Sequence, residues 1–343
     1  MSDLPPGASP PSVHPAIDDP VTREPQAACR FSLVVPVYGN EGSIPELLDA
    51  IAGIASRLDE PFEAVFVVDG SPDDSAALLD RGLPEQPFAS TVVHLSRNFG
   101  SFAAIRAGLE VVSGTCVAVM AADLQEPPEL IDQFYALLAA DEADIVVGER
   151  TARADSSSTK LGSAVFWSLF RRFIQPDMPA GGVDVFGCND QVRRAIVGMR
   201  ESNSSLVGLL IWMGFRRVGV PYERRERTSG KSGWTLSKKV RYMADSVFSF
   251  TDLPIRLLLF TGVIGLLGTI LASVVVFIGW ATNHIEVPGY TPLMLALLIV
   301  SGLMLCALGI IGSYVWRTYE NTKQRPITLV QSTQHHAGRS TDA

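Results

Sequence analysis

The sequence predicts an α/β fold in which a mostly parallel sheet carries helices on both faces and membrane-associated helices follow it. Between residues 31 and 150, uninterrupted apolar runs alternate with segments of helical spacing. This alternation is typical of a parallel sheet whose strands are buried on both faces. Two uncharged runs follow at 257–283 and 287–316, and each exceeds the roughly 20 apolar residues that span a bilayer.

Five strands and four helices are expected in order along the first half of the chain. Helical spacing and turn residues place the helices: Asp74 or Ser75 can cap the second, Gly114 closes the third, and the fourth begins at a Pro-Pro pair, which is tolerated in a first turn. The strands are expected at 31–38, 62–69, 90–96, 115–123 and 143–150, and the helices at 44–58, 76–82, 97–114 and 127–140.

Composition limits the classes of function. The chain has 343 residues, enough for one large or two ordinary domains, and a formal net charge of −8. That charge gives no electrostatic support to a nucleic-acid partner, and none is expected. The four cysteines stand far apart without a CxxC pair, so they are expected to be reduced thiols rather than a disulfide framework or a zinc site.

The charges beside the apolar runs predict a membrane topology. Arg256 precedes the first run and Arg317 follows the second, whereas the connector holds only His284 and Glu286. Cytoplasmic loops carry the excess of Lys and Arg, so we expect a multi-pass protein of the cytoplasmic membrane with both termini cytoplasmic. A buried hairpin of a soluble protein is the alternative. The expected division is a disordered lead at 1–29, a cytoplasmic α/β domain at 30–234, a juxtamembrane helix at 235–254, a transmembrane hairpin at 255–318 and a disordered tail at 319–343.

Two further segments have amphipathic helical spacing, at 158–174 and 235–250. The stretch from Arg216 to Arg256 carries ten basic and four acidic residues in an otherwise acidic chain. These segments are expected either to pack on the core or to lie in the headgroup plane of a lipid bilayer, with the basic stretch facing anionic lipid or a phosphate-bearing substrate.

Polar residues just after the predicted strands are the candidates for chemistry, because ligands of such sheets bind outside the carboxyl ends of the strands. No P-loop or GxGxxG spacing follows the first strand and no G-x-S-x-G elbow exists. Carboxylates and arginines remain, which suit a divalent cation and phosphates. They are Glu41, Asp69, Arg97, Asp123, Gln125 and Arg150.

The stretches "VVPVYGNEGSIPELL", "VFVVDGSPDDS", "LSRNFGSFAAIRAGLE" and "MAADLQEPPELI" resemble, in order and spacing, the inverting family 2 glycosyltransferases of GT-A (Rossmann-like) fold. "GGVDVFGCNDQV", "RTSGKSGWTLSKKV" and the two apolar runs resemble the polyprenyl-phosphate glycosyltransferases within that family. The resemblance covers about residues 30–320. It implies transfer of a sugar from a nucleotide-sugar, UDP-linked glucose being the first expectation, to a polyprenyl phosphate of undecaprenyl type at the cytoplasmic membrane face.

The resemblance also implies roles for individual residues. Asp123 and Gln125 would bind a divalent cation, Mg²⁺ or Mn²⁺; Asp184 and Asp123 would be catalytic; and Arg227 and Lys231 would contact the acceptor or the diphosphate. The expected nucleotide-sugar contacts are Pro36, Tyr38, Glu41, Asp69 and Arg150.

The chain departs from the family pattern at four positions. Val68 and Ala121 stand where aspartates are usual, Lys231 replaces an acidic residue, and Gly233 replaces a Lys or Asn. With Ala121 in the metal motif, we expect weaker or altered metal dependence rather than loss of function.

Several alternatives stay open. Asp69 and Asp123 could be ordinary strand-end or helix-capping residues, and Asp184 an ordinary loop residue. The chain could also be a processive polysaccharide synthase, although "QVRRAI" does not match that class and two spans make a poor channel, or a degenerate transferase-like membrane scaffold. The small residues of "GVIGLLG" (262–268) favour close helix packing and a homo-oligomer.

Overall fold

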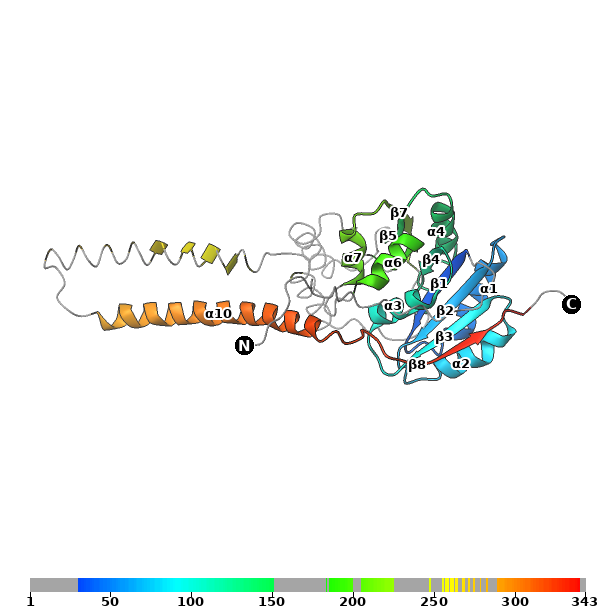
Figure 1. Ribbon diagram of the computed structural model, residues 1–343, viewed down its shortest axis with the longest axis horizontal. Helices are drawn as coiled ribbons and strands as arrows, with labels where there is room; N and C mark the ends of the chain where they lie inside the picture. The colour runs from blue at the N-terminus through cyan, green and yellow to red at the C-terminus, as the bar shows by residue number, and fades with distance from the viewer. Residues whose placement is uncertain are drawn as a thin grey trace, which may run out of the picture.

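The computed structural model describes residues 30–150, 185–199, 205–224 and 289–339, together with residue 183 and scattered positions between 247 and 282. Both amphipathic segments fall almost entirely outside the described residues, as does the lead at 1–29. The described part is an α/β domain from which one long helix extends (Figure 1).

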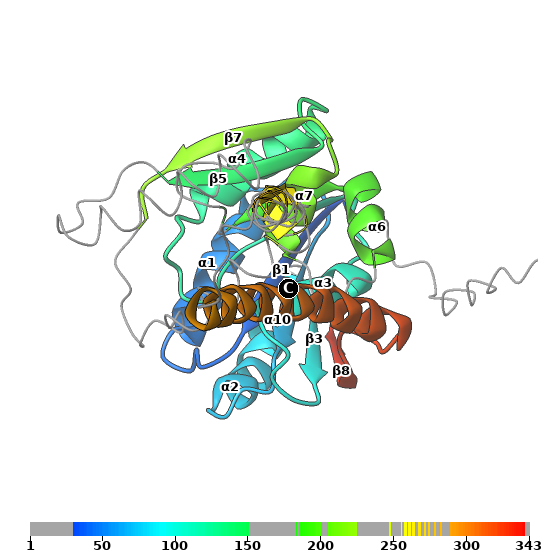
Figure 2. The same cartoon turned by 90° about the vertical axis from the view of Figure 1, so that its left-hand side faces the viewer.

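One eight-stranded sheet organises the domain, in the order β7-β5-β6-β4-β1-β2-β3-β8. The predicted mostly parallel sheet is confirmed, with β6 and β8 as its antiparallel members. Figure 2 shows β7 and β8 at opposite ends of the sheet. The strands are β1 (Phe31–Val37), β2 (Phe62–Val68), β3 (Ala89–Leu95), β4 (Cys116–Val119), β5 (Ile145–Arg150), β6 (Phe186–Asn189), β7 (Arg217–Tyr222) and β8 (Val330–His336).

Helices cover both faces of the sheet, as the uninterrupted apolar strands predict. Adjacent β1 residues point to opposite faces: Leu33 joins one buried apolar cluster with α1, α2 and α4, and Val34 joins another with α3, α6 and α7. The helices are α1 (Ile44–Ser56), α2 (Ser75–Gly82), α3 (Ser101–Val111), α4 (Glu129–Ala139), α6 (Asp190–Gly198) and α7 (Leu206–Trp212), with a 3-10 turn η1 at Leu83–Glu85.

The fourth strand ends earlier than predicted. The apolar run continues to Asp123, but β4 stops at Val119, where its pairing with β1 also ends. Leu124 then adopts a left-handed backbone conformation, with φ of 52°. The apolar pattern of the sequence could not predict this turn, because Met120, Ala122 and Leu124 are as buried as the residues of a strand. The residues after β4 therefore form a loop at the sheet edge.

The expected disordered tail is wrong for most of residues 319–343. Residues up to Thr322 continue a helix, and residues 330–336 form β8, which pairs antiparallel with β3. Thr91 Oγ1 lies 2.9 Å from His335 Nδ1, and Arg339 forms an ion pair with Glu85 at 2.9 Å. The tail is polar because it is an exposed edge strand, held by the backbone hydrogen bonds that β3 offers at the sheet edge.

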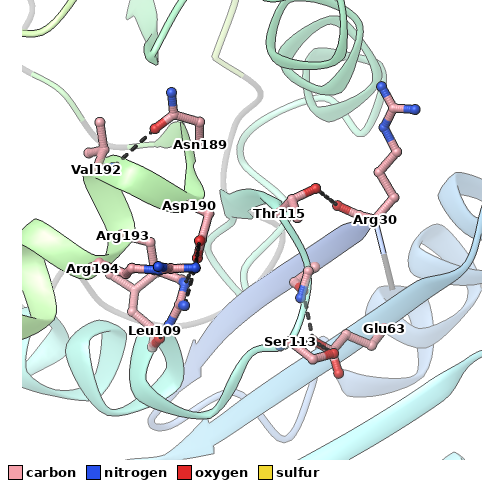
Figure 3. A network of polar contacts seen from close by, with 12 residues as sticks. Arg30, Glu63, Leu109, Ser113, Thr115, Asn189, Asp190, Val192, Arg193 and Arg194 are labelled. Atoms are coloured by element: carbon pink, nitrogen blue, oxygen red, sulfur yellow. Dashed lines mark hydrogen bonds and ion pairs between the residues drawn. The ribbon is translucent and has the colours of Figure 1, made fainter. Parts of the chain in front are cut away.

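A separate polar network lies at the opposite edge, where the parallel strands begin (Figure 3). The Asn189 side chain caps α6 by accepting from the Val192 backbone N–H at 3.0 Å, while Asp190 pairs with Arg193 at 2.6 Å. Ser113 donates to Glu63 from both its backbone and its hydroxyl. These groups satisfy one another and secure helix ends to the sheet.

The helix α10 (Tyr290–Thr322) covers all but the first three residues of the second predicted span and extends away from the sheet domain (Figure 1). Within the described residues, one helix segment, Val300–Thr322, is long and apolar enough to cross a membrane. The first predicted span at 257–283 is described only at scattered positions. Leu258 at the start of that span and Ile255 just before it line an apolar groove of about 640 Å³ together with α10 residues such as Tyr314 and Thr318.

Candidate functional site

Two sets of loops follow the strands at the carboxyl edge of the sheet. The first set, the β1–β3 loops, comprises residues 38–43, 69–75 and 96–100. The second, the β4–β7 loops, comprises residues 120–128, Arg150 and residues 222–224. Strands β1 to β5 and β7 run in the same direction, so topology brings both sets to one edge.

The β1–β3 loops hold one another through hydrogen bonds between side chains and backbone. Gly39 N–H donates to Ser71 Oγ at 2.8 Å, and Asn40 N–H donates to Ser75 Oγ at 3.1 Å. Glu41 N–H donates to Asp73 Oδ2 at 2.9 Å. The loop after β1 therefore has its backbone donors satisfied by the loop after β2.

Asp69 connects the loops after β2 and β3. It is buried, and its carboxylate accepts from Phe99 N–H at 2.7 Å and Gly100 N–H at 2.8 Å. The next residue, Gly70, has φ of +58°, and a Cβ there would lie 2.5 Å from the backbone carbon of Arg97. The two loops thus pack backbone against backbone, which only glycine permits at residue 70.

Asp73 is the acceptor at the centre of these loops. Its partial burial would raise the pKa of its carboxyl, but hydrogen bonds from Ser71, Ser75 and the Glu41 backbone outweigh burial and lower the pKa. The same donors therefore favour the charged form of Asp73, and that form stabilises the loop arrangement.

The loop after β4 carries the predicted metal motif. Ser43 Oγ donates to the Ala122 carbonyl at 2.8 Å, which ties this loop to the start of α1. Leu124 has the positive φ already described, a conformation that non-glycine residues rarely adopt and that concentrates at functional sites. Half-buried Asp123 precedes it, and buried Gln125 follows it.

Glu126 is the most enclosed charged group of the β4–β7 loops. The residue is 0 % exposed, and among the described residues neither carboxylate oxygen has a hydrogen-bond partner. Arg224 Nε lies 3.9 Å from Glu126 Oε1. Burial raises the pKa of this carboxyl, while the positive charges of Arg224 and Arg150 act in the opposite direction.

Two arginines lie near Glu126, one at the end of β5 and one just after β7. Arg150 ends β5 and lies opposite Tyr222 in the β5–β7 register, and Arg224 follows Tyr222 by two residues. Arg224 donates to Gln125 Oε1. Burial, then the nearby Glu126 charge, raises the pKa of the Tyr222 hydroxyl, and a hydrogen bond from Arg150 opposes that rise.

The residues after β4 fit a divalent cation. Asp123, Gln125 and Glu126 supply carboxylate and amide oxygens, the donors that Mg²⁺ and Mn²⁺ prefer. The carboxylate of Glu126, buried without a hydrogen bond from any described residue, is an acceptor that a cation could satisfy. Among the described residues, no group of three or more His, Cys, Asp or Glu side chains could hold a metal ion. The amide oxygen of Gln125 adds a further possible ligand beside these carboxylates.

The predicted site residues fall into three groups: those on the β1–β3 loops, those on the β4–β7 loops, and those outside the described residues. Exposed Tyr38 and Glu41 and the partly buried Pro36 lie on or beside the first loop, Asp69 is enclosed beneath the β1–β3 loops, and Arg150 lies on the other side. Asp184, Arg227 and Lys231 lie outside the described residues. Val185 accepts from Gly148 N–H, so the backbone next to Asp184 runs beside the end of β5.

Sequence reasoning missed Glu126 and left Arg224 unassigned. The only signal for Glu126 was a carboxylate between Gln125 and a Pro-Pro pair. Arg224 is one of several arginines in a basic stretch, and its contact with Gln125 spans 99 positions in the chain.

Comparison with known proteins identifies the family. Residues 32–197 match the model of glycosyl transferase family 2. CsbB of Bacillus subtilis (strain 168), a protein provisionally named as a glycosyltransferase, is 34% identical over 302 residues, which cover 88% of this chain and 91% of that protein. The chain belongs to glycosyl transferase family 2.

A second relative carries a more specific name. The undecaprenyl-phosphate 4-deoxy-4-formamido-L-arabinose transferase of Sodalis glossinidius (strain morsitans) is 32% identical over 307 residues, which cover 88% of this chain and 93% of that protein. An uncharacterized glycosyltransferase of Synechocystis, sll0501, is 32% identical over 303 residues. Both similarities extend far beyond the family-model match, so they include much of the chain after residue 197.

Proposed function

We propose that this family 2 glycosyltransferase transfers a sugar from a nucleotide-sugar to a polyprenyl phosphate at the cytoplasmic face of a membrane. The observation that carries the proposal is the similarity, over 88% of the chain, to a relative named as an undecaprenyl-phosphate sugar transferase. Arg224 lies beside Gln125 and Glu126, and the charge of Arg150 also acts on Glu126. This arrangement supports the proposal, because arginines bind phosphates and a divalent cation takes carboxylate and amide oxygens as ligands.

The donor would lie along the carboxyl edge of the sheet, with the nucleoside toward the β1–β3 loops and the diphosphate toward the β4–β7 loops. Tyr38, about 50% exposed on the first loop, offers an aromatic face to a base. UDP-linked glucose is the first donor to test. Asp69 would act by holding the pocket wall, since its carboxylate already accepts two backbone N–H groups.

The acceptor would approach from the membrane side. The apolar α10, the first predicted span at 257–283 and the Lys and Arg residues beside them support a hairpin with both ends cytoplasmic. The groove between Ile255, Leu258 and α10 offers an apolar surface for the isoprenoid part of the lipid near the foot of that hairpin. Arg227 and Lys231 would meet its phosphate.

Positioning and charge neutralisation would supply most of the catalysis. The acceptor phosphate is already an anion at neutral pH, so little proton abstraction is needed. Asp184 would orient it. Arg150 and Arg224 would hold the donor phosphates, and Asp123 and Gln125 would hold a cation, Mg²⁺ or Mn²⁺, whose charge stabilises the departing nucleoside diphosphate.

A transfer assay tests this proposal. The full chain, purified in detergent, is incubated with Mn²⁺ or Mg²⁺, undecaprenyl phosphate and a panel of labelled UDP-, GDP- and other nucleotide-sugars. We expect one donor to yield a lipid carrying a single sugar. A water-soluble polymer would instead indicate a processive synthase, and absence of both transfer and nucleotide binding with every donor would favour a non-catalytic scaffold.

A further inference from the structure

The loop after β4 lacks one carboxylate of the usual pattern but contains another. Ala121 stands where the resemblance implies the first aspartate, and Glu126 lies on the same loop, beyond Gln125. Glu126 is fully enclosed, yet no group in the described part of the chain donates a hydrogen bond to either of its oxygens. An ionised carboxylate in that state is costly unless a positive charge lies close to it.

Arg224 supplies that positive charge in this structure. Its guanidinium donates to the side-chain oxygen of Gln125, and its Nε lies 3.9 Å from Glu126 Oε1. One arginine therefore faces both an amide oxygen and a carboxylate oxygen of adjacent residues. Those are the two kinds of oxygen that a hard divalent cation takes as ligands.

We infer that Gln125 and Glu126 form an exchangeable cation seat, occupied by the Arg224 guanidinium in this structure and by the divalent cation when the donor is bound. Glu126 thereby supplies the carboxylate that Ala121 cannot. Arg224, once displaced, is free to pair with the donor diphosphate. This inference rests on the proposed function for the identity of the donor, but cation binding can be measured without sugar transfer.

Charge balance supports the exchange. Among the described residues, the carboxylates of Asp123 and Glu126 are matched by the guanidinium groups of Arg150 and Arg224, and both arginines act electrostatically on Glu126. A divalent cation entering alone would leave excess positive charge. A diphosphate that enters with the cation would restore the balance. The cation should therefore bind the nucleotide-bound protein more tightly than the free protein, and the nucleotide should bind the cation-bound protein more tightly in the same way.

Mn²⁺ binding to the full-length protein tests the seat, measured by electron paramagnetic resonance with and without UDP. We expect Glu126→Gln to weaken Mn²⁺ binding at least about tenfold, as loss of a charged ligand should. Glu129→Gln, which changes an exposed carboxylate three residues further on, is the matched control and should change it less than about twofold. Unchanged binding in Glu126→Gln would overturn the inference, as would absence of Mn²⁺ binding to the wild type under both conditions.

Two further variants separate ligation from damage to the fold. Ala121→Asp in the Glu126→Gln background should restore Mn²⁺ binding, because it returns a carboxylate to the loop; failure to restore it would contradict the seat. Arg224→Gln should tighten binding of Mn²⁺ alone several-fold, since the competing guanidinium is gone, and should weaken binding of UDP. Weaker binding of Mn²⁺ alone in Arg224→Gln would rule out exchange. Sugar transfer is not part of this readout, so a failed transfer assay leaves the result on the seat intact.

Discussion

The two sets of loops at the carboxyl edge of the sheet use their polar groups in opposite ways. In the β1–β3 loops, carboxylates such as Asp69 and Asp73 are saturated by backbone and hydroxyl donors of the same loops. In the β4–β7 loops, Glu126 is fully enclosed and accepts no hydrogen bond from the residues that the structure describes. The first set is already complete as folded, whereas the second has acceptors that a ligand can satisfy. The β1–β3 loops thus provide a fixed framework, and the β4–β7 loops provide the groups that bind a ligand.

The largest effect is expected from the β4–β7 loops. Asp123→Asn should lower the rate of sugar transfer by about 100-fold or more, because it removes charge stabilisation where negative charge develops, while the melting temperature stays near that of the wild type. Steady-state transfer rates and thermal unfolding measure the two properties. Asp141→Asn, an exposed carboxylate at the opposite edge that pairs with Arg216, is the control. Equal activity of Asp123→Asn and wild type would remove Asp123 from the site.

The β1–β3 loops should respond in stability. Gly70→Ala must place a Cβ 2.5 Å from the Arg97 backbone at φ of +58°, so we expect a loss of at least about 2 kcal/mol in the free energy of unfolding. Gly39→Ala shares the positive φ, at +69°, but has open space around its Cβ, and should cost only about 1 kcal/mol. Equal costs in denaturant titrations would mean that the close approach of the two loops is not a constraint.

Asp69→Asn should reduce both stability and donor affinity. The amide offers one acceptor where the carboxylate has two, and its NH₂ group would face a backbone N–H, so the expected cost is about 1–3 kcal/mol. The Michaelis constant for the donor should rise more than the turnover number falls, because in the proposed site Asp69 shapes the pocket wall on the nucleoside side and the diphosphate lies toward the β4–β7 loops. A variant with wild-type melting temperature and donor affinity would show that Asp69 does not hold the loop after β3.

The smallest expected effect is a dependence of stability on pH. Hydrogen bonds lower the pKa of Asp73 in the folded protein, so its contribution to stability is complete above the unfolded value of about 3.9 and is lost as pH falls through the folded value. The melting-temperature difference between wild type and Asp73→Asn should therefore be constant from pH 5 upward and should shrink toward pH 3. A difference that grows on acidification would contradict the assignment.

Much of the fold could be predicted from the sequence because the strands are buried on both faces. The run at 62–69 is apolar enough to define β2 to within one residue. The polar stretch that forms β8 gave no such signal, because an edge strand exposed to solvent is held by backbone hydrogen bonds rather than by apolar side chains. The turn at Leu124 was equally hidden, since its φ depends on packing and not on the residue type.

Some residues of the candidate site could also be predicted from the sequence, and others could not. Asp123, Gln125 and Arg150 could be proposed because each stands at the end of a predicted strand or within a recognisable motif. Glu126 and Arg224 could not, because their proximity depends on how β7 packs beside β5 and brings residue 224 to the loop after β4.

Backbone hydrogen exchange with and without UDP and Mn²⁺ tests the contrast between the two sets of loops most directly. Added ligand should slow exchange mainly in residues 120–126 and 222–224, while residues 39–41 and 99–100, whose N–H groups already donate to side chains, should change little. Slower exchange confined to the β1–β3 loops, with none in the β4–β7 loops, would contradict the account.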